Sequence, residues 1–246
     1  IAALAYKYFA ERYGMGNRSI EVQWALRDDG SASLIRIIDL EAYSQVTTLE
    51  TYLAIPEKST SGSNREIGLE DIESEPPFRE VKATKVEQHN NRLSVSLSID
   101  PPLRNGDLLK YKMQENLAKK LYSIGLTAEQ QKLREKQYDY SGWNINLPTK
   151  KIVLKVFIPV KAKPKEFWAE VRYASTAGFP ANRIQLEETE RLSKPSFSFE
   201  GELFVLKLEV DYPMLGLIYL LAWEPVTREN LSVKNEVLSS TDSKQQ

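Results

Sequence analysis

The sequence predicts an all-β protein with minor helix, in which two tandem β-sandwich units of the immunoglobulin-like class are joined by a helical linker. Two observations carry this prediction. Short stretches that alternate apolar and polar residues recur along the 246 residues, with turn residues between them. A longer pattern also occurs twice, at residues 94–113 and 204–223. Each copy would lie in a unit of about 100 residues, the usual size of such a sandwich.

The repeated pattern is a strand, a corner and a second strand. The first strand alternates apolar and polar residues, and the corner has the form Asp-x-Pro, at residues 100–102 and again at 211–213. A glycine then leads into the second strand. Isoleucine-proline pairs at 55–56 and 158–159 end an earlier strand in each copy. This common order of landmarks predicts that one β unit has been duplicated.

Two helices are predicted from their end signals. Residues Ala2–Tyr13 can place Leu4, Tyr8 and Phe9 with the alanines in one apolar stripe, and Gly14 ends the helix. Residues 115–137 are expected to be helical and polar on most sides, with Thr127 as the N-cap and Gln130 completing a capping box.

The strands of the first unit follow from period-two alternation. Ile20 to Leu26 alternates as a half-buried strand, and Asp28 to Ser31 forms a turn in which glycine adopts the left-handed region. Ala32 to Leu40 is apolar on both faces, which predicts a central strand. Trp24 and Trp223 alternate with apolar strand residues and are expected in the core.

These elements divide the chain into five segments. They are an N-terminal helix leading in from an upstream region at 1–17, a first sandwich unit at 18–114, the helical linker at 115–137, a second sandwich unit at 138–226 and a disordered tail at 227–246.

Composition bounds the function. The formal net charge is -1, so no overall field favours nucleic acid or an anionic membrane. No apolar run approaches the roughly 18 to 20 residues that cross a bilayer. The absence of cysteine favours a reducing compartment, and a cytoplasmic location is expected. We therefore expect neither a membrane nor a nucleic acid as partner.

Motifs for catalysis and for metal or cofactor binding are missing from the sequence. His89 is the only histidine, too few for a zinc site in a chain without cysteine. Neither a G-x-S-x-G elbow nor a nucleotide-binding glycine loop occurs. The acidic stretches at 66–75 and 187–190 lack calcium-loop spacing and are expected to be solvated. We therefore predict no catalytic residue, no metal and no cofactor, and a non-enzymatic protein. A hydrolase with two carboxylates converging within about 5 to 10 Å is the enzymatic alternative.

Lysines are dense at residues 150–165 and 110–120. Beside aromatic residues they could hold single-stranded nucleic acid. The interpretation favoured by the overall charge is that they protect sheet edges from aggregation.

An aromatic group in the second unit supplies the candidate binding residues, which are Tyr138, Tyr140, Trp143 and Trp168. Exposed tyrosine and tryptophan rings on a sandwich face can stack on sugars or anchor a protein partner. Trp143 lies in a segment with glycine and asparagine and is expected to be partly exposed. Burial of the group in the core is the alternative.

The function that these features favour is non-catalytic. The chain is predicted to be a recognition or interaction region of a larger multidomain bacterial regulatory, signalling or defence protein, whose partner is a protein or another domain of the same polypeptide. The alternative is a carbohydrate-binding module that uses an exposed aromatic face.

Overall fold

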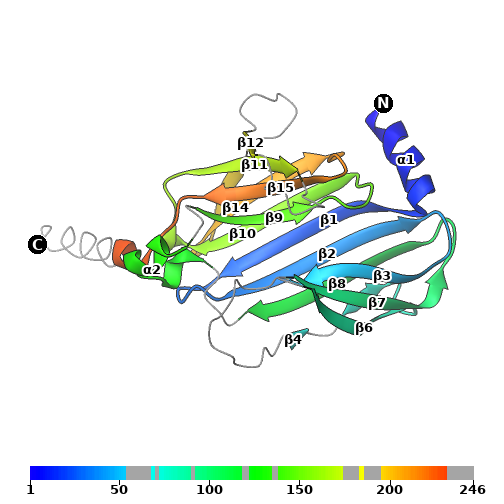
Figure 1. Ribbon diagram of the computed structural model, residues 1–246, viewed down its shortest axis with the longest axis horizontal. Coiled ribbons are helices and arrows are strands. Elements are labelled where there is room, and N and C mark those ends of the chain that lie inside the picture. The colour runs from blue at the N-terminus through cyan, green and yellow to red at the C-terminus, as the bar shows by residue number, and fades with distance from the viewer. Residues whose placement is uncertain are drawn as a thin grey trace, which may run out of the picture.

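The protein is mostly β, and one large sheet carries two smaller sheets on one of its faces (Figure 1). The computed structural model describes residues 1–53, 68–69, 72–89, 92–117, 122–134, 138–173, 183–185 and 195–231. The helices are α1 (Ala2–Tyr13), η1 (Ser123–Gly125), α2 (Ala128–Lys132) and η2 (Val160–Ala162). The strands are β1 (Met15–Leu26), β2 (Ala32–Ala42), β3 (Val46–Leu53), β4 (Gly68–Leu69), β5 (Glu73–Glu75), β6 (Glu80–His89), β7 (Arg92–Leu103), β8 (Leu108–Leu117), β9 (Asp139–Asn144), β10 (Lys151–Pro159), β11 (Phe167–Tyr173), β12 (Arg183–Gln185), β13 (Ser196–Glu200), β14 (Leu203–Asp211) and β15 (Leu217–Trp223).

The large sheet has the order β13-β14-β10-β1-β2-β8-β4, and β5 also pairs with β8. Its centre is a parallel pair, in which β1 lies beside β10 with Ile20 opposite Ile152 and Trp24 opposite Val156. These four side chains belong to one buried core cluster. Strands from the two halves of the sequence thus share one sheet. The other long strand pairs of this sheet are antiparallel, namely β1–β2, β2–β8, β10–β14 and β13–β14.

The two smaller sheets cover the inner face of the large one. The β3 sheet has the order β3-β7-β6 and the β9 sheet has the order β12-β11-β15-β9. Core side chains come from the large sheet and from both smaller ones, as Leu34, Leu97 and Trp223 illustrate. Aromatic contacts connect the two halves, because Tyr122 meets Trp24 edge to face at 5.6 Å and stacks on Trp223 at 5.4 Å between ring centroids.

The two Asp-x-Pro segments occupy different places in the fold, and only the second connects the large sheet with a small one. Residues 100–102 lie inside β7, which stays in the β3 sheet as far as Leu103, and only after that does the chain pass to β8 in the large sheet. After residue 211 it passes from β14, in the large sheet, to β15 in the β9 sheet. The local pattern therefore repeats, whereas the sheet that each strand joins does not. The tandem immunoglobulin-like units are not confirmed.

The predicted helical linker at 115–137 is not confirmed either. Glu115 and Leu117 belong to β8, and helix α2 occupies five residues only. The predicted capping box is confirmed, since the Gln130 amide donates to Thr127 Oγ1 and the Thr127 amide donates to Gln130 Oε1. Buried Asp139 accepts from the Ser123 amide at 2.9 Å and from Arg134 at 3.0 Å, which ties this segment to β9.

Helix α1 has the predicted bounds and ends at Gly14, whose φ is 76°. The predicted apolar stripe is wrong, however. Leu4, Tyr8 and Phe9 are exposed, and Tyr6 and Ala10 are the buried residues. Helix α1 packs against β1, the strand that it leads into, and buries a narrow face there. The sequence alone does not fix which face that is. No helix in the described part of the chain is long and apolar enough to cross a membrane.

Other local predictions are confirmed. The turn at 28–31 forms, with Gly30 at φ 80° and the Ser31 amide donating to Asp29 Oδ1 at 2.9 Å. Strand β2 is central, and Trp24 and Trp223 are buried. The predicted turn at 90–91 lies outside the described residues, as does the tail from 232 onward; residues 228–231 form a helical turn.

Many of the lysines that could have held nucleic acid are paired with acids on the sheets. Lys150, Lys151, Lys155 and Lys161 each form an ion pair with a carboxylate, and so do Lys110 and Lys112 with the acids of β5. Paired charges of this kind solubilise a sheet face and leave less positive potential for a phosphate backbone. The lysines of β8 and β10 lie on strands that pair on both sides within the large sheet, so they do not protect sheet edges as expected.

The ion pairs of Glu209 with Lys151 and Lys207 predict how the stability of the protein depends on pH. Hydrogen bonds from Lys151 and then from Lys207 lower the pKa of Glu209 from 4.5 to about 2. Because the folded-state pKa is depressed, the stabilisation is present above the ordinary value and is lost as the pH falls from about 5 to 2. We expect Glu209→Gln to lower the free energy of unfolding by up to about 1 kcal/mol at pH 7, since the side chain is partly exposed. Urea unfolding should show the same stability for both proteins near pH 2, and a difference that persists there would contradict the assignment.

Candidate functional site

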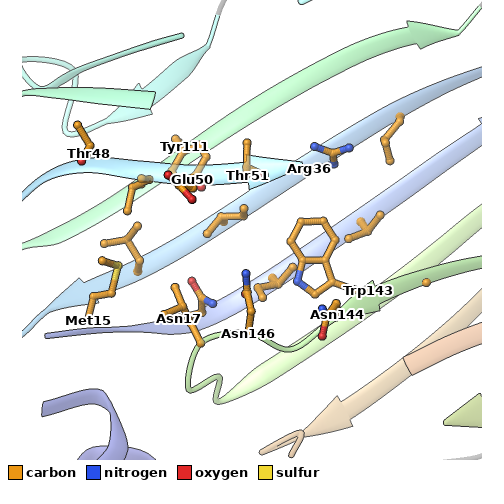
Figure 2. Close-up of a pocket in the computed structure, with 18 of the residues that line it drawn as sticks. Met15, Asn17, Arg36, Thr48, Glu50, Thr51, Tyr111, Trp143, Asn144 and Asn146 are labelled. Atoms are coloured by element: carbon orange, nitrogen blue, oxygen red, sulfur yellow. The ribbon is translucent and has the colours of Figure 1, made fainter. Parts of the chain in front are cut away.

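A pocket of about 600 Å³ lies between the two smaller sheets (Figure 2). Its floor is the inner face of β1 and β2, where apolar side chains such as Val22, Leu34 and Ile38 point up. Strand β3 forms one wall and the end of β9 forms the other. We call this space the central pocket. It exists because the β3 sheet and the β9 sheet leave uncovered the middle of the larger sheet that they share.

Arg36 interrupts the apolar floor. Residues of β2 alternate in burial, so Arg36 shares the inner face with Leu34 and Ile38 and is only 3% exposed. Its partner is Glu115 of β8, which is 1% exposed, with Nη2 2.6 Å from the carboxylate oxygen Oε1. Burial lowers the pKa of Arg36, and the neighbouring carboxylate opposes that shift. A buried ion pair of this kind adds little net stability but fixes both side chains in place.

The indole of Trp143 lies over this guanidinium, 5.7 Å from its carbon to the ring centroid. Among the described residues, Nε and Nη1 of Arg36 and the indole nitrogen of Trp143 have no hydrogen-bond partner. Each unpaired buried donor costs about 1–3 kcal/mol. Three such donors therefore meet at the side of an apolar pocket, and each can donate a hydrogen bond to an oxygen atom of a ligand.

The mouth of the pocket is polar. Glu50 and Thr48 come from β3, and Asn144 and Asn146 come from β9 and the segment after it (Figure 2). Glu50 and Asn144 are exposed, so they meet solvent where the floor does not. The pocket thus combines an apolar interior with charged and amide groups at its entrance, which is the usual composition of a small-molecule site.

A second feature lies on the outer face of the β9 sheet and is called the outer aromatic face. It consists of Tyr138, Tyr140, Trp168, Glu170 and Arg172. Tyr138 packs against Trp168 at 5.3 Å and against Tyr140 at 6.1 Å between ring centroids. The guanidinium of Arg172 lies over both tyrosine rings.

Glu170 holds the outer aromatic face together. It is fully buried, and it accepts from the Tyr138 hydroxyl at 2.9 Å, from the Trp168 indole at 2.8 Å and from Arg172 at 3.1 Å. The rings are therefore fixed by a carboxylate beneath them. A fixed platform of half-buried rings loses little conformational entropy on binding a flat ligand.

The structure separates the four predicted binding residues. Tyr138, Tyr140 and Trp168 are together on the outer aromatic face, whereas Trp143 is on the opposite face of the same sheet and lines the central pocket. The interval from Tyr140 to Trp143 is odd, and successive strand residues point to opposite faces. Strict alternation along β9 would have predicted this separation from the sequence.

The sequence also carried a signal for Arg36 and Glu115. Each is the one charged residue in a row of alternating inward residues, Leu34-x-Arg36-x-Ile38 in β2 and Met113-x-Glu115-x-Leu117 in β8. The sequence prediction treated β2 as apolar on both faces and therefore did not single out Arg36. Opposite charges in the buried rows of two neighbouring strands predict a buried ion pair.

A third feature is the free edge of the large sheet at β13. All five residues of β13 are exposed, and no described strand pairs with its outer edge. Phe197 and Phe199 are each 54% exposed and stand beside buried Phe204. We call Phe197 and Phe199 on β13 the β13 edge. The β13 edge extends the inner apolar face of the large sheet. It lies past the part of that face which is covered by the described residues of the β9 sheet.

No group of three or more histidine, cysteine, aspartate or glutamate side chains that could hold a metal ion occurs among the described residues. The side chain of His89 and most of the acidic stretches at 66–75 and 187–190 lie outside them. Within the described part, Glu73 pairs with Lys112 and Glu75 with Lys110.

Comparison with known proteins gives a distant likeness only. No family model and no curated protein matches the sequence. Among solved structures, the M1 zinc metallopeptidase from Deinococcus radiodurans is 10% identical with a TM-score of 0.44, over 85% of this chain and 42% of that one. A mutant two-domain M1 zinc metallopeptidase bound to L-tryptophan is 9% identical with a TM-score of 0.44, over the same shares of the two chains. The chain thus spans less than half the length of these enzymes, and a likeness at this TM-score carries no inference about activity.

Proposed function

We propose that this chain is a non-catalytic recognition region that binds a protein partner along the β13 edge. The single observation that carries the proposal is a fully exposed edge strand with two half-exposed phenylalanines, at the border of an eight-stranded sheet. An unpaired edge offers backbone donors and acceptors to an added strand. The rings beside it offer pockets for alternate side chains of that strand.

The geometry supports a segment that binds in extended form. Phe197 and Phe199 are two residues apart and so lie on one face of β13, with Phe204 and Phe167 as neighbours. Lys163 lies over the rings of Phe197 and Phe199 at 5.8 and 5.1 Å. The surface is apolar with a basic rim, which favours a partner strand with alternating apolar residues and an acidic neighbour.

Selection of peptides from a displayed random library tests this proposal. We expect the enriched peptides to alternate apolar and polar residues. Their affinity should fall at least about tenfold in the Phe197→Ser, Phe199→Ser double variant, because two apolar contacts at the centre of the interface are lost. Phe78→Ser is the matched control, since Phe78 is an exposed phenylalanine on a different surface. Enriched peptides that bind the double variant as well as the native protein would refute the proposal.

The second candidate is carbohydrate binding by the outer aromatic face. The observation that favours it is the set of three rings fixed around Glu170. Affinity electrophoresis in gels that contain soluble polysaccharides tests it. We expect Trp168→Ala and Tyr140→Ala to abolish retardation, and Trp143→Ala to leave it unchanged because Trp143 is on the other face. Unretarded native protein across diverse polysaccharides would leave protein recognition as the proposal.

Duplication of one β unit also stays a proposal. Its support is the shared local order of hairpin, strand and Asp-x-Pro corner, with β6–β7 and β13–β14 as the corresponding hairpins.

A further inference from the structure

The central pocket, which is separate from the β13 edge, contains donors that no described residue uses. Arg36 makes one ion pair, through Nη2 to Glu115, and its Nε and Nη1 have no partner within the described part of the chain. The side chain is buried and stands in the pocket floor between apolar neighbours (Figure 2). Nearly all buried polar groups in native proteins are hydrogen-bonded. A ligand oxygen that accepts hydrogen bonds from Nε and Nη1 of Arg36 therefore stabilises the site.

Trp143 determines how a ligand reaches these donors. Its indole covers the guanidinium, and its own nitrogen is also unpartnered among described residues. It stands near the end of β9, next to the exposed Asn144, rather than deep in the core. Both side chains line the pocket, so a ligand that binds Arg36 also packs its body against the Trp143 ring.

The rest of the lining defines the body of the ligand. The floor is apolar over β1 and β2, and among the described residues the only other charged side chain in the lining is Glu50 at the exposed mouth. A ligand that fills the pocket is therefore apolar along its length and carries its charge at the end beside Arg36. Hydrogen bonds from a guanidinium to a carboxylate are about twice as strong as neutral ones.

We propose that the central pocket binds a small monocarboxylate with an apolar body. The carboxylate accepts hydrogen bonds from the unpaired nitrogens of Arg36, and the apolar body lies on the floor of β1 and β2 beside Trp143. Glu115 holds the guanidinium in place from the other side. Glu50 at the mouth opposes the negative charge of the ligand.

Calorimetric titration with octanoate and with 1-octanol tests the proposal, because the two share an apolar chain and differ in the head group. We expect octanoate to bind at least about tenfold more tightly. We also expect its binding to change Trp fluorescence in the native protein, and to change it less in Trp143→Phe, where Trp24 of the floor is the remaining tryptophan of the lining. Equal affinities, a preference for the alcohol, or no saturable binding of octanoate would overturn the proposal.

A double variant distinguishes binding to Arg36 from nonspecific apolar binding in the pocket. The double variant Arg36→Met, Glu115→Met replaces the buried pair with apolar side chains of similar length. It should lose octanoate affinity at least about tenfold and keep its affinity for 1-octanol. Unchanged octanoate binding in that variant would overturn the proposal.

The exposed variant Glu50→Gln gives a test that does not depend on refolding of the core. We expect it to tighten octanoate binding about two- to fivefold by removing a repulsive charge, with no effect on 1-octanol. Glu200→Gln, an exposed change on β13, is the matched control. No tightening in Glu50→Gln would contradict the placement of the carboxylate in this pocket.

Discussion

Gly125→Ala is expected to destabilise the protein by about 3 kcal/mol, at the upper end of what overpacking costs. A Cβ atom at Gly125 would stand 2.0 Å from the carbonyl oxygen and 2.3 Å from the carbonyl carbon of Asp29. Both atoms belong to the backbone of the turn between β1 and β2, which cannot rotate away as a side chain can. Gly125 is buried in η1, so the new methyl group has no route to solvent.

The effect reaches beyond one contact because this turn joins β1 and β2, two neighbouring inner strands of the large sheet. Arg27 and Ser31 close it by a backbone hydrogen bond of 2.9 Å, and Gly30 adopts a positive φ within it. A shift of Asp29 therefore strains the β1–β2 pair at its end. Chemical unfolding of Gly125→Ala beside the native protein measures the loss.

Gly201→Ala is the matched control for this prediction. A Cβ atom at Gly201 meets nothing within 4 Å, and only its φ of 60° opposes the substitution. We expect a cost of about 1 kcal/mol there, which is the ordinary strain of a left-handed residue. Similar losses in the two variants would mean that the approach of η1 to the turn is looser than the structure shows.

Local features could be predicted from the sequence because neighbours along the chain decide them. The bounds of α1 follow from Gly14, the cap of α2 from Thr127 and Gln130, and the turn after β1 from Asp29 and Gly30. Each of these signals acts within four or five residues. Side-chain hydrogen bonds and permitted φ values fix them whatever the rest of the fold does.

Sheet membership could not be predicted in the same way. The parallel pairing of β1 with β10 joins strands more than a hundred residues apart, and no local residue pattern specifies a partner at that distance. The two Asp-x-Pro corners show the limit clearly. The same local pattern lies inside a strand of the β3 sheet at one place and leads from the large sheet into the β9 sheet at the other.

The candidate site was partly within reach of the sequence. Tyr138, Tyr140 and Trp168 are close together as predicted, but the alternation of β9 sends Trp143 to the other face. The central pocket itself depends on how two small sheets are spaced over a large one, which is a long-range property. The β13 edge could not be predicted from the sequence for the same reason, because an edge strand is one that lacks a neighbouring strand on one side.

Arg36→Met alone is expected to lower the free energy of unfolding by about 3–5 kcal/mol, because it leaves the Glu115 carboxylate buried without its cation. Glu115 is 1% exposed and cannot turn to water without opening the contact between β2 and β8. The double variant Arg36→Met, Glu115→Met should recover the loss and be at least as stable as the native protein. It removes both desolvated charges and the two unpaired nitrogens of the guanidinium at once.

A double-mutant cycle with Glu115→Met, followed by urea unfolding, measures this coupling. The sum of the stability losses in the two single variants should exceed the loss in the double variant by several kcal/mol. Lys110→Met, which breaks the exposed pair with Glu75, is the control and should cost no more than about 1 kcal/mol. Additive losses would show that Arg36 and Glu115 are stabilised independently. In that case the ion pair would not be what holds the guanidinium at the pocket, and the argument for a carboxylate beside it would lose its fixed donor.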